Sequence, residues 1–141
     1  MLRGISHLIS PELLKVLSEM GHGDEIVLAD ANFPTETFGK RSIRADGIAC
    51  CDLLNAILPL FPLDQYDISN FVLMEVVPGD PYNPVIWKEF IAVLSQYEPE
   101  AQVQHIERFA FYERAKKAYS VVATGEKMQY ANIILKKGVV K

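Results

Sequence analysis

Cysteine is scarce in this 141-residue chain, which has only two. Cys50 and Cys51 are adjacent, a spacing that suits neither an ordinary disulfide nor a tetrahedral zinc site. Because both lie in an apolar stretch, we interpret them as buried small hydrophobic residues. The cysteines therefore predict neither a disulfide framework nor a metal centre.

Long apolar runs and a basic stripe are also missing. No stretch approaches the roughly 20 apolar residues that cross a bilayer, and residues 1–10 lack the hydrophobic segment of a signal peptide. The net charge is -4, whereas proteins that bind nucleic acid usually carry a basic stripe. We therefore expect a cytoplasmic protein that binds neither membrane nor nucleic acid.

Hydrophobic residues, in contrast, make up half of the chain. That is enough for one core, and 141 residues are too few for two ordinary domains, so we expect a single domain over residues 1–141. Hydrophobic periodicity, capping residues and turn residues predict helices that open at Ser10 and at Asn83-Pro84 and helices over 48–60 and 109–118. Strands are predicted over 26–29, 41–45, 71–77, 102–107, 120–123 and 133–135. This alternation predicts a three-layer α/β/α domain with helices on both faces of a mostly parallel, mixed sheet of about six strands.

His22 is the first candidate for chemistry because glycines flank it, and glycine lets the backbone adopt unusual conformations and a ligand approach closely. Gly21 is expected to stop the preceding helix. The helix dipole and the nearby Asp24 and Glu25 should favour the protonated imidazole, which suits general acid catalysis. The alternative is that His22 merely finishes the helix.

Four further polar residues stand at or near predicted element boundaries. Asp30 ends a strand, where open α/β sheets bind ligands, although it could instead cap a helix. Arg108 lies at a strand-to-helix junction, and an ordinary surface salt bridge is its alternative. Tyr130 and Asn132 offer the donors and acceptors that sugar hydroxyls need, although turn chemistry alone would also explain Asn132. No phosphate loop, zinc spacing or nucleophile elbow is present, so nucleotide and metal chemistry are disfavoured.

Several blocks together resemble one family over essentially the whole chain. Met20-Gly21-His22-Gly23-Asp24-Glu25, Asp30-Ala31-Asn32-Phe33-Pro34 and Ile43-Arg44-Ala45-Asp46-Gly47 are similar to the fucose mutarotase and ribose pyranase family. Four further blocks resemble the fucose mutarotase branch specifically: Ile106-Glu107-Arg108-Phe109, Phe111-Tyr112-Glu113-Arg114-Ala115, Ala123-Thr124-Gly125-Glu126 and Asn132-Ile133-Ile134-Leu135-Lys136-Lys137-Gly138. In the ribose branch a histidine would be expected near Arg108, which further favours a fucose-like substrate.

The resemblance implies an isomerase that interconverts the α and β anomers of L-fucose by ring opening and reclosure, with no cofactor and no metal. It implies that His22 is the proton donor and that Asp30, Arg108 and the triplet Tyr130-Ala131-Asn132 bind the sugar. The family has glycine where Ala131 stands, and a positive φ at Ala131 would impose strain. A ribose pyranase, a broader monosaccharide mutarotase and a non-catalytic sugar-binding protein are the alternatives.

The resemblance also implies ring-like homo-oligomers, often decamers. His22 and Asp30 bracket a predicted strand of about five residues, which separates them by some 15 Å or more at roughly 3.3 Å per residue. One sugar cannot easily touch both residues. Either the His22 loop folds back along the sheet or a neighbouring subunit completes the pocket.

Overall fold

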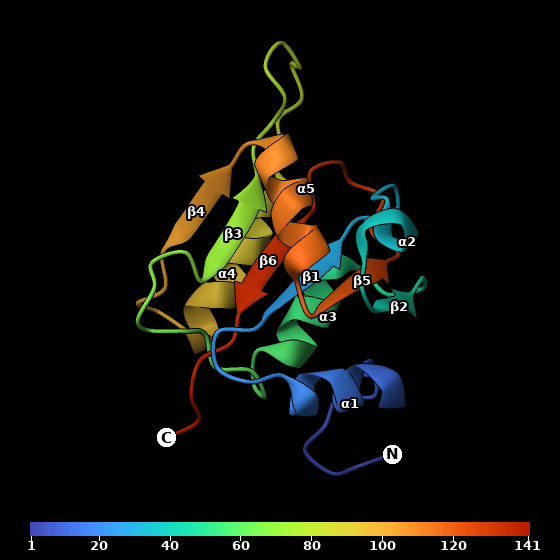
Figure 1. Ribbon diagram of the computed structural model, residues 1–141, viewed down its shortest axis with the longest axis vertical. Helices are drawn as coiled ribbons and strands as arrows, with labels where there is room; N and C mark the ends of the chain where they lie inside the picture. The colour runs from blue at the N-terminus through green and yellow to red at the C-terminus, as the bar shows by residue number, and fades with distance from the viewer.

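Six strands form one mixed sheet in the order β2-β5-β1-β6-β3-β4 in the computed structural model, which describes residues 1–141 (Figure 1). The strands are β1 Glu25–Ala29, β2 Ser42–Ala45, β3 Phe71–Met74, β4 Val103–Ile106, β5 Ser120–Thr124 and β6 Ile133–Lys136. β6 runs antiparallel to β1 and β3, whereas the pairs β1–β5, β2–β5 and β3–β4 are parallel. The predicted mixed, mostly parallel sheet of about six strands is confirmed.

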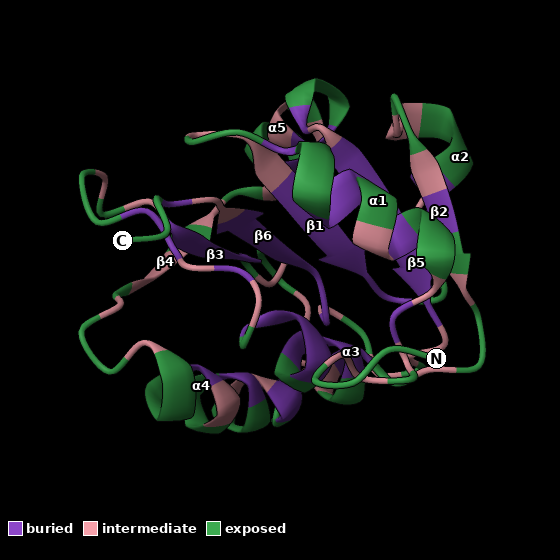
Figure 2. Cartoon of the chain, turned by 90° about the horizontal axis from the view of Figure 1, so that it is seen from below, coloured by how far each residue is buried: buried purple, intermediate pink, exposed green.

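Five helices cover the sheet: α1 Pro11–Glu19, α2 Thr35–Phe38, α3 Cys50–Ile57, α4 Ile86–Tyr97 and α5 Arg108–Lys117. The buried residues of α1, α3 and α4 belong to one hydrophobic cluster, and those of α5 belong to a second cluster. In the view from below, helices α3 and α4 lie on one side of the sheet and α5 lies on the other (Figure 2). Helix α1 lies across the amino ends of β1 and β5 (Figure 2). The three-layer arrangement is therefore confirmed, and none of these helices is both long and apolar enough to span a membrane.

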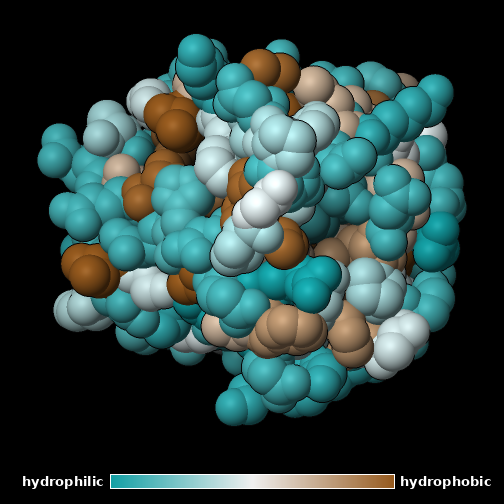
Figure 3. All heavy atoms as spheres, turned by 90° about the horizontal axis from the view of Figure 1, so that it is seen from above, coloured by the Kyte–Doolittle hydropathy of each residue, from teal (hydrophilic) through white to brown (hydrophobic).

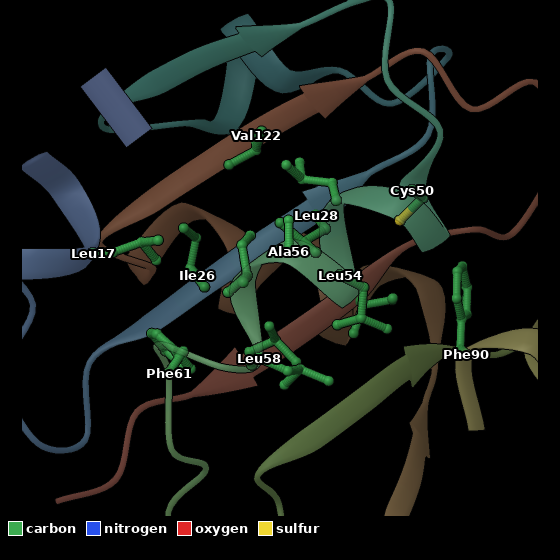
Figure 4. Packing of buried hydrophobic residues seen from close by; sticks show 14 of the residues in the cluster. Leu17, Ile26, Leu28, Cys50, Leu54, Ala56, Leu58, Phe61, Phe90 and Val122 are labelled. Atoms are coloured by element: carbon green, nitrogen blue, oxygen red, sulfur yellow. The ribbon is translucent and has the colours of Figure 1, made fainter. Parts of the chain in front are cut away.

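The central strands supply both hydrophobic clusters because successive residues of a strand face opposite sides of the sheet. In β1, Ile26 and Leu28 pack in the cluster of α1, α3 and α4, whereas Val27 and Ala29 pack in the cluster of α5. Figure 4 shows Leu54 of α3 in the same packed group as Ile26 and Leu28. A strand buried on both faces must be apolar at every position, which explains the continuous apolar run of β1.

Several predicted boundaries are wrong for local reasons. Helix α3 ends at Ile57, and Pro59, which cannot continue the hydrogen-bond ladder, follows directly after the cap residue Leu58. Strand β3 ends at Met74 instead of continuing to Val77, whose N–H donates to the Tyr130 hydroxyl at 3.3 Å. The one-turn helix α2 was not predicted.

Both cysteines were predicted to be buried. This is confirmed for Cys50, which is fully buried, and wrong for Cys51, which is half-buried.

Candidate functional site

Four of the predicted site residues line one pocket at the end of the sheet where β1 ends and β6 begins. Asp30, Arg108, Tyr130 and Asn132 are all part of its lining, and the pocket has a volume of about 190 Å³. Asp30 follows the last residue of β1, and Asn132 precedes the first residue of β6, which is the antiparallel neighbour of β1. The face of the molecule seen from this end is mostly hydrophilic, with hydrophobic side chains in small separate patches (Figure 3).

Asp30 and Asn132 hold each other through two hydrogen bonds. The Asp30 amide donates to Asn132 Oδ1 at 2.9 Å, and Asn132 Nδ2 donates to Asp30 Oδ2 at 3.0 Å. The other carboxylate oxygen, Oδ1, accepts from the Asn32 amide at 2.9 Å. Burial raises the pKa of the Asp30 carboxyl, and the hydrogen bonds that the carboxylate accepts act in the opposite direction. Asp30 therefore closes a turn at the pocket instead of capping a helix, since α2 begins after Pro34.

Tyr130 adopts a left-handed backbone conformation, with φ of 60°, and is the only non-glycine residue that does so. Trp87 Nε1 donates to the Tyr130 carbonyl at 2.9 Å. The Tyr130 hydroxyl donates to Asp80 Oδ2 at 2.6 Å and accepts from the Val77 amide at 3.3 Å. The hydrogen bond to Asp80 raises the pKa of the phenol. Contacts with distant residues thus stabilise a strained conformation at the pocket.

Ala131, the middle residue of the triplet, is placed differently from its two neighbours. Its side chain is fully buried and belongs to the hydrophobic cluster of α1, α3 and α4. The positive φ lies at Tyr130, so the alanine itself carries no strain of that kind. Ala131 does not line the pocket, unlike Tyr130 and Asn132 on either side of it.

Arg108 is the first residue of α5 and makes no salt bridge, which excludes the surface ion pair as its explanation. Its guanidinium carbon lies 4.5 Å from the centre of the Phe109 ring. The Nε atom is buried and has no hydrogen-bond partner. A buried donor without a partner costs free energy, so Arg108 is suited to a ligand that supplies an acceptor.

His22 lies at the opposite end of β1 from this pocket. The amide of Gly23 donates to the Lys137 carbonyl at 2.8 Å, and the Lys137 amide donates to the Asp24 carbonyl at 2.8 Å. These bonds tie the His22 loop to the chain just after the end of β6, whereas Asn132 stands before its beginning. The loop does not fold back along the sheet, so one chain does not bring His22 to Asp30.

The surroundings of His22 also differ from the sequence expectation. Helix α1 ends at Glu19, with Met20 as its cap residue, and Lys137 Nζ donates to the carbonyls of Leu17 and Met20 at 2.8 and 2.6 Å. His22 is therefore not needed to finish the helix. Asp24 and Glu25 are engaged elsewhere, with the Gly21 amide and with Arg114.

The carboxylate that contacts His22 comes from Asp64, which sequence reasoning missed. His22 Nε2 lies 3.0 Å from Asp64 Oδ1, and the two residues are 42 positions apart. Asp64 belongs to the loop between α3 and β3, where no motif marks it. Asp80, which holds the Tyr130 hydroxyl, was missed for the same reason.

Residues 3–140 match the sequence profile of the RbsD / FucU transport protein family. The fucose mutarotase of Streptococcus pneumoniae, solved in complex with L-fucose, is 50% identical, with 99% of this chain and 100% of that chain covered and a TM-score of 0.94. FucU from Bifidobacterium longum is also 50% identical, with the same coverage and a TM-score of 0.96. Bacillus subtilis RbsD, solved with D-ribose, is 23% identical over the full length of both chains with a TM-score of 0.73 and so shares the fold.

Proposed function

The chain belongs to the RbsD / FucU transport protein family, and from this membership we propose that it is an isomerase, a fucose mutarotase that interconverts the α and β anomers of L-fucose. The observation that carries the proposal is the full-length, 50% identity to a fucose mutarotase solved with L-fucose. The pocket geometry supports it. Asp30, Arg108, Tyr130 and Asn132 offer both donors and acceptors around a small open pocket, as a monosaccharide requires.

Anomer exchange needs only the movement of protons. The ring opens when the ring carbon–oxygen bond breaks, its electron pair stays on the ring oxygen, and an acid protonates that oxygen. At the same time a base removes the proton from the anomeric hydroxyl, and an aldehyde forms. Rotation about one bond followed by the reverse transfers gives the other anomer. We propose His22 as the acid. Asp30, the one carboxylate that lines the pocket, is proposed to bind the sugar.

Arg108, Tyr130 and Asn132 are proposed to hold the sugar. The unpartnered Arg108 Nε supports a hydrogen bond to a sugar oxygen. Two hydrogen bonds with Asp30 fix the Asn132 amide. The second N–H of Nδ2 and the second acceptor position of Oδ1 are therefore oriented for a ligand. Ala131 is proposed to support these two side chains from the core without touching the sugar, because it is fully buried.

A second copy of the chain is proposed to supply His22 to the pocket of its neighbour. The hydrogen bonds of the His22 loop support this arrangement, since they keep His22 at the far end of β1 from Asp30. Exposed aromatic side chains, such as Tyr66 beside His22 and Phe109 beside Arg108, offer surface for such contacts. We further propose a ring-like homo-oligomer, a decamer, that works in the cytoplasm.

Saturation-transfer NMR on L-fucose tests the proposed activity, because it measures exchange between anomers directly. Wild-type protein is expected to accelerate exchange well beyond the spontaneous rate. His22→Gln should reduce the catalysed rate by about 10²-fold or more, since a general acid typically contributes 10² to 10⁴.

The control for this experiment is D-ribose, assayed beside L-fucose with the same protein. Faster exchange on ribose than on fucose would select a ribose pyranase. Binding of fucose with exchange at the spontaneous rate would select a non-catalytic sugar-binding protein and would overturn the proposal.

A further inference from the structure

The imidazole of His22 contacts a carboxylate that is almost completely buried. The His22 side chain is 48% exposed, whereas the side chain of Asp64 is 4% exposed. Asp64 is the only hydrogen-bond partner of the ring, at 3.0 Å through Nε2. One nitrogen of the ring thus faces a buried acceptor, and the other, Nδ1, has no protein partner.

The same carboxylate oxygen also accepts a hydrogen bond from a backbone amide, which indicates the direction of its hydrogen bond with His22. The Tyr66 amide donates to the same oxygen, Asp64 Oδ1, at 3.1 Å. Burial raises the pKa of Asp64, but hydrogen bonds from His22 and from the Tyr66 amide outweigh burial and lower it below the ordinary value. Because Asp64 Oδ1 already accepts from the Tyr66 amide, the carboxylate is placed as the acceptor, and we assign the hydrogen of its contact with His22 to Nε2.

Asp64 and His22 are held by the same short piece of chain. The Asp64 amide donates to the Lys136 carbonyl at 3.0 Å, and the Gly23 amide, next to His22, donates to the Lys137 carbonyl at 2.8 Å. Asn70 Nδ2 donates to the Asp64 carbonyl at 2.6 Å. Consecutive residues at the end of β6 thus fix the loop of the acid and the loop of its partner relative to each other.

We propose that Asp64 is a positioning residue for His22, an inference that depends on the proposed mutarotase function. Asp64 keeps the hydrogen on Nε2, so that Nδ1 is the ring nitrogen that exchanges a proton. Nδ1 is then the atom that gives its proton to the ring oxygen of the sugar and recovers it at reclosure. Asp64 itself stays ionised and does not touch the sugar.

The first test reads the position of the hydrogen directly. Protein labelled with ¹⁵N-histidine is studied at alkaline pH by long-range ¹H–¹⁵N correlation, which distinguishes a protonated ring nitrogen from an unprotonated one. The expected result is a His22 ring protonated at Nε2. In Asp64→Ala, which loses the acceptor, both tautomers should be populated. A wild-type ring protonated at Nδ1 would overturn the proposal.

The second test measures kcat and KM for fucose exchange in Asp64→Asn. Asparagine keeps an oxygen for the Tyr66 amide but removes the charge, so kcat should fall by about 10- to 100-fold, as for other partners that orient a functional histidine. KM should change little, because Asp64 is not in contact with the sugar. Unchanged kcat, or a rise in KM alone, would contradict the positioning role.

Asp67→Asn is the matched control, because Asp67 lies in the same loop and pairs with Lys136 instead of His22. Its kcat should equal that of wild type. An equal loss of kcat in both variants would indicate a general effect of the loop and overturn the proposal. Failure of the proposed function gives a different result, since wild-type protein would then show no catalysed exchange while the tautomer of His22 could still be read.

Discussion

At the scale of single residues, the methyl group of Ala131 contributes to the core and not to the pocket. Ala131 is fully buried, and it packs in the cluster of α1, α3 and α4. Ala131→Gly should therefore lower the free energy of unfolding by about 1 to 2 kcal/mol, from the lost methyl burial and the added backbone freedom of glycine. The affinity for L-fucose should not change. Denaturant unfolding and sugar titration check the two parts, and a change in affinity without a change in stability would contradict this assignment.

Residues with a local signature could be predicted from the sequence, and residues without one could not. Asp30, Arg108 and Asn132 stand at the ends of predicted elements, where a polar side chain next to apolar residues is conspicuous. Asp64 and Asp80 meet His22 and Tyr130 only through the fold, across 42 and 50 positions. The positive φ of Tyr130 was equally hidden, because contacts from Trp87 and Asp80 stabilise a conformation that tyrosine rarely adopts alone.

At the scale of elements, the end of β6 organises the loops around His22. Besides its bonds to the two loops, the chain passes so close to Leu63 that a Cβ atom on Gly138 would lie within 2.4 Å of the Leu63 carbonyl oxygen. Only glycine permits this approach. Lys136 also anchors the loop that carries Asp64, because its Nζ donates to Asp67 Oδ2 at 2.6 Å.

This ion pair makes the stability of the loop depend on pH in a defined direction. The hydrogen bond from Lys136 lowers the pKa of Asp67 below its ordinary value, so the pair stabilises the fold above the pKa of the unfolded chain, about 4. That contribution is lost as the pH falls through the lower pKa of the folded state. Asp67→Asn should therefore be slightly less stable than wild type at neutral pH, by less than about 1 kcal/mol because the pair is partly exposed.

The measurement is the denaturant midpoint of both proteins between neutral pH and about pH 3. The difference between wild type and variant should shrink toward zero as the pH falls. A difference that stays constant or grows in acid would show that the Asp67 carboxylate does not stabilise the fold through its charge.

Periodicity predicted the strands and four of the five helices, but not how the strands pair. The apolar run of β6 reads the same whichever way the strand runs, so its antiparallel direction had no local signal. Helix α2 has a single turn, too short for a hydrophobic period. Its one fully enclosed side chain is Thr35, a polar residue whose burial the pattern does not reveal.

At the scale of the whole molecule, the proposed acid and the proposed sugar pocket lie at opposite ends of the sheet. His22 precedes β1 and is tied to the residues after β6, whereas Asp30 follows β1 and is tied to Asn132 before β6. Because the two ends of one strand cannot meet, each copy would carry two half-sites. Copies that pack end to end would then complete each other's pockets.

Complementation between two inactive variants tests this arrangement. His22→Gln removes the acid and Arg108→Gln removes a pocket residue, so each pure protein should show little catalysed exchange of fucose anomers. If a site takes His22 from one copy and Arg108 from its neighbour, mixed oligomers made by co-expression should contain wild-type pairs at about a quarter of their sites. Saturation-transfer NMR should then show activity that neither parent has. Light scattering verifies that the mixed protein is oligomeric, and mixed oligomers without exchange would mean that each active site belongs to a single chain.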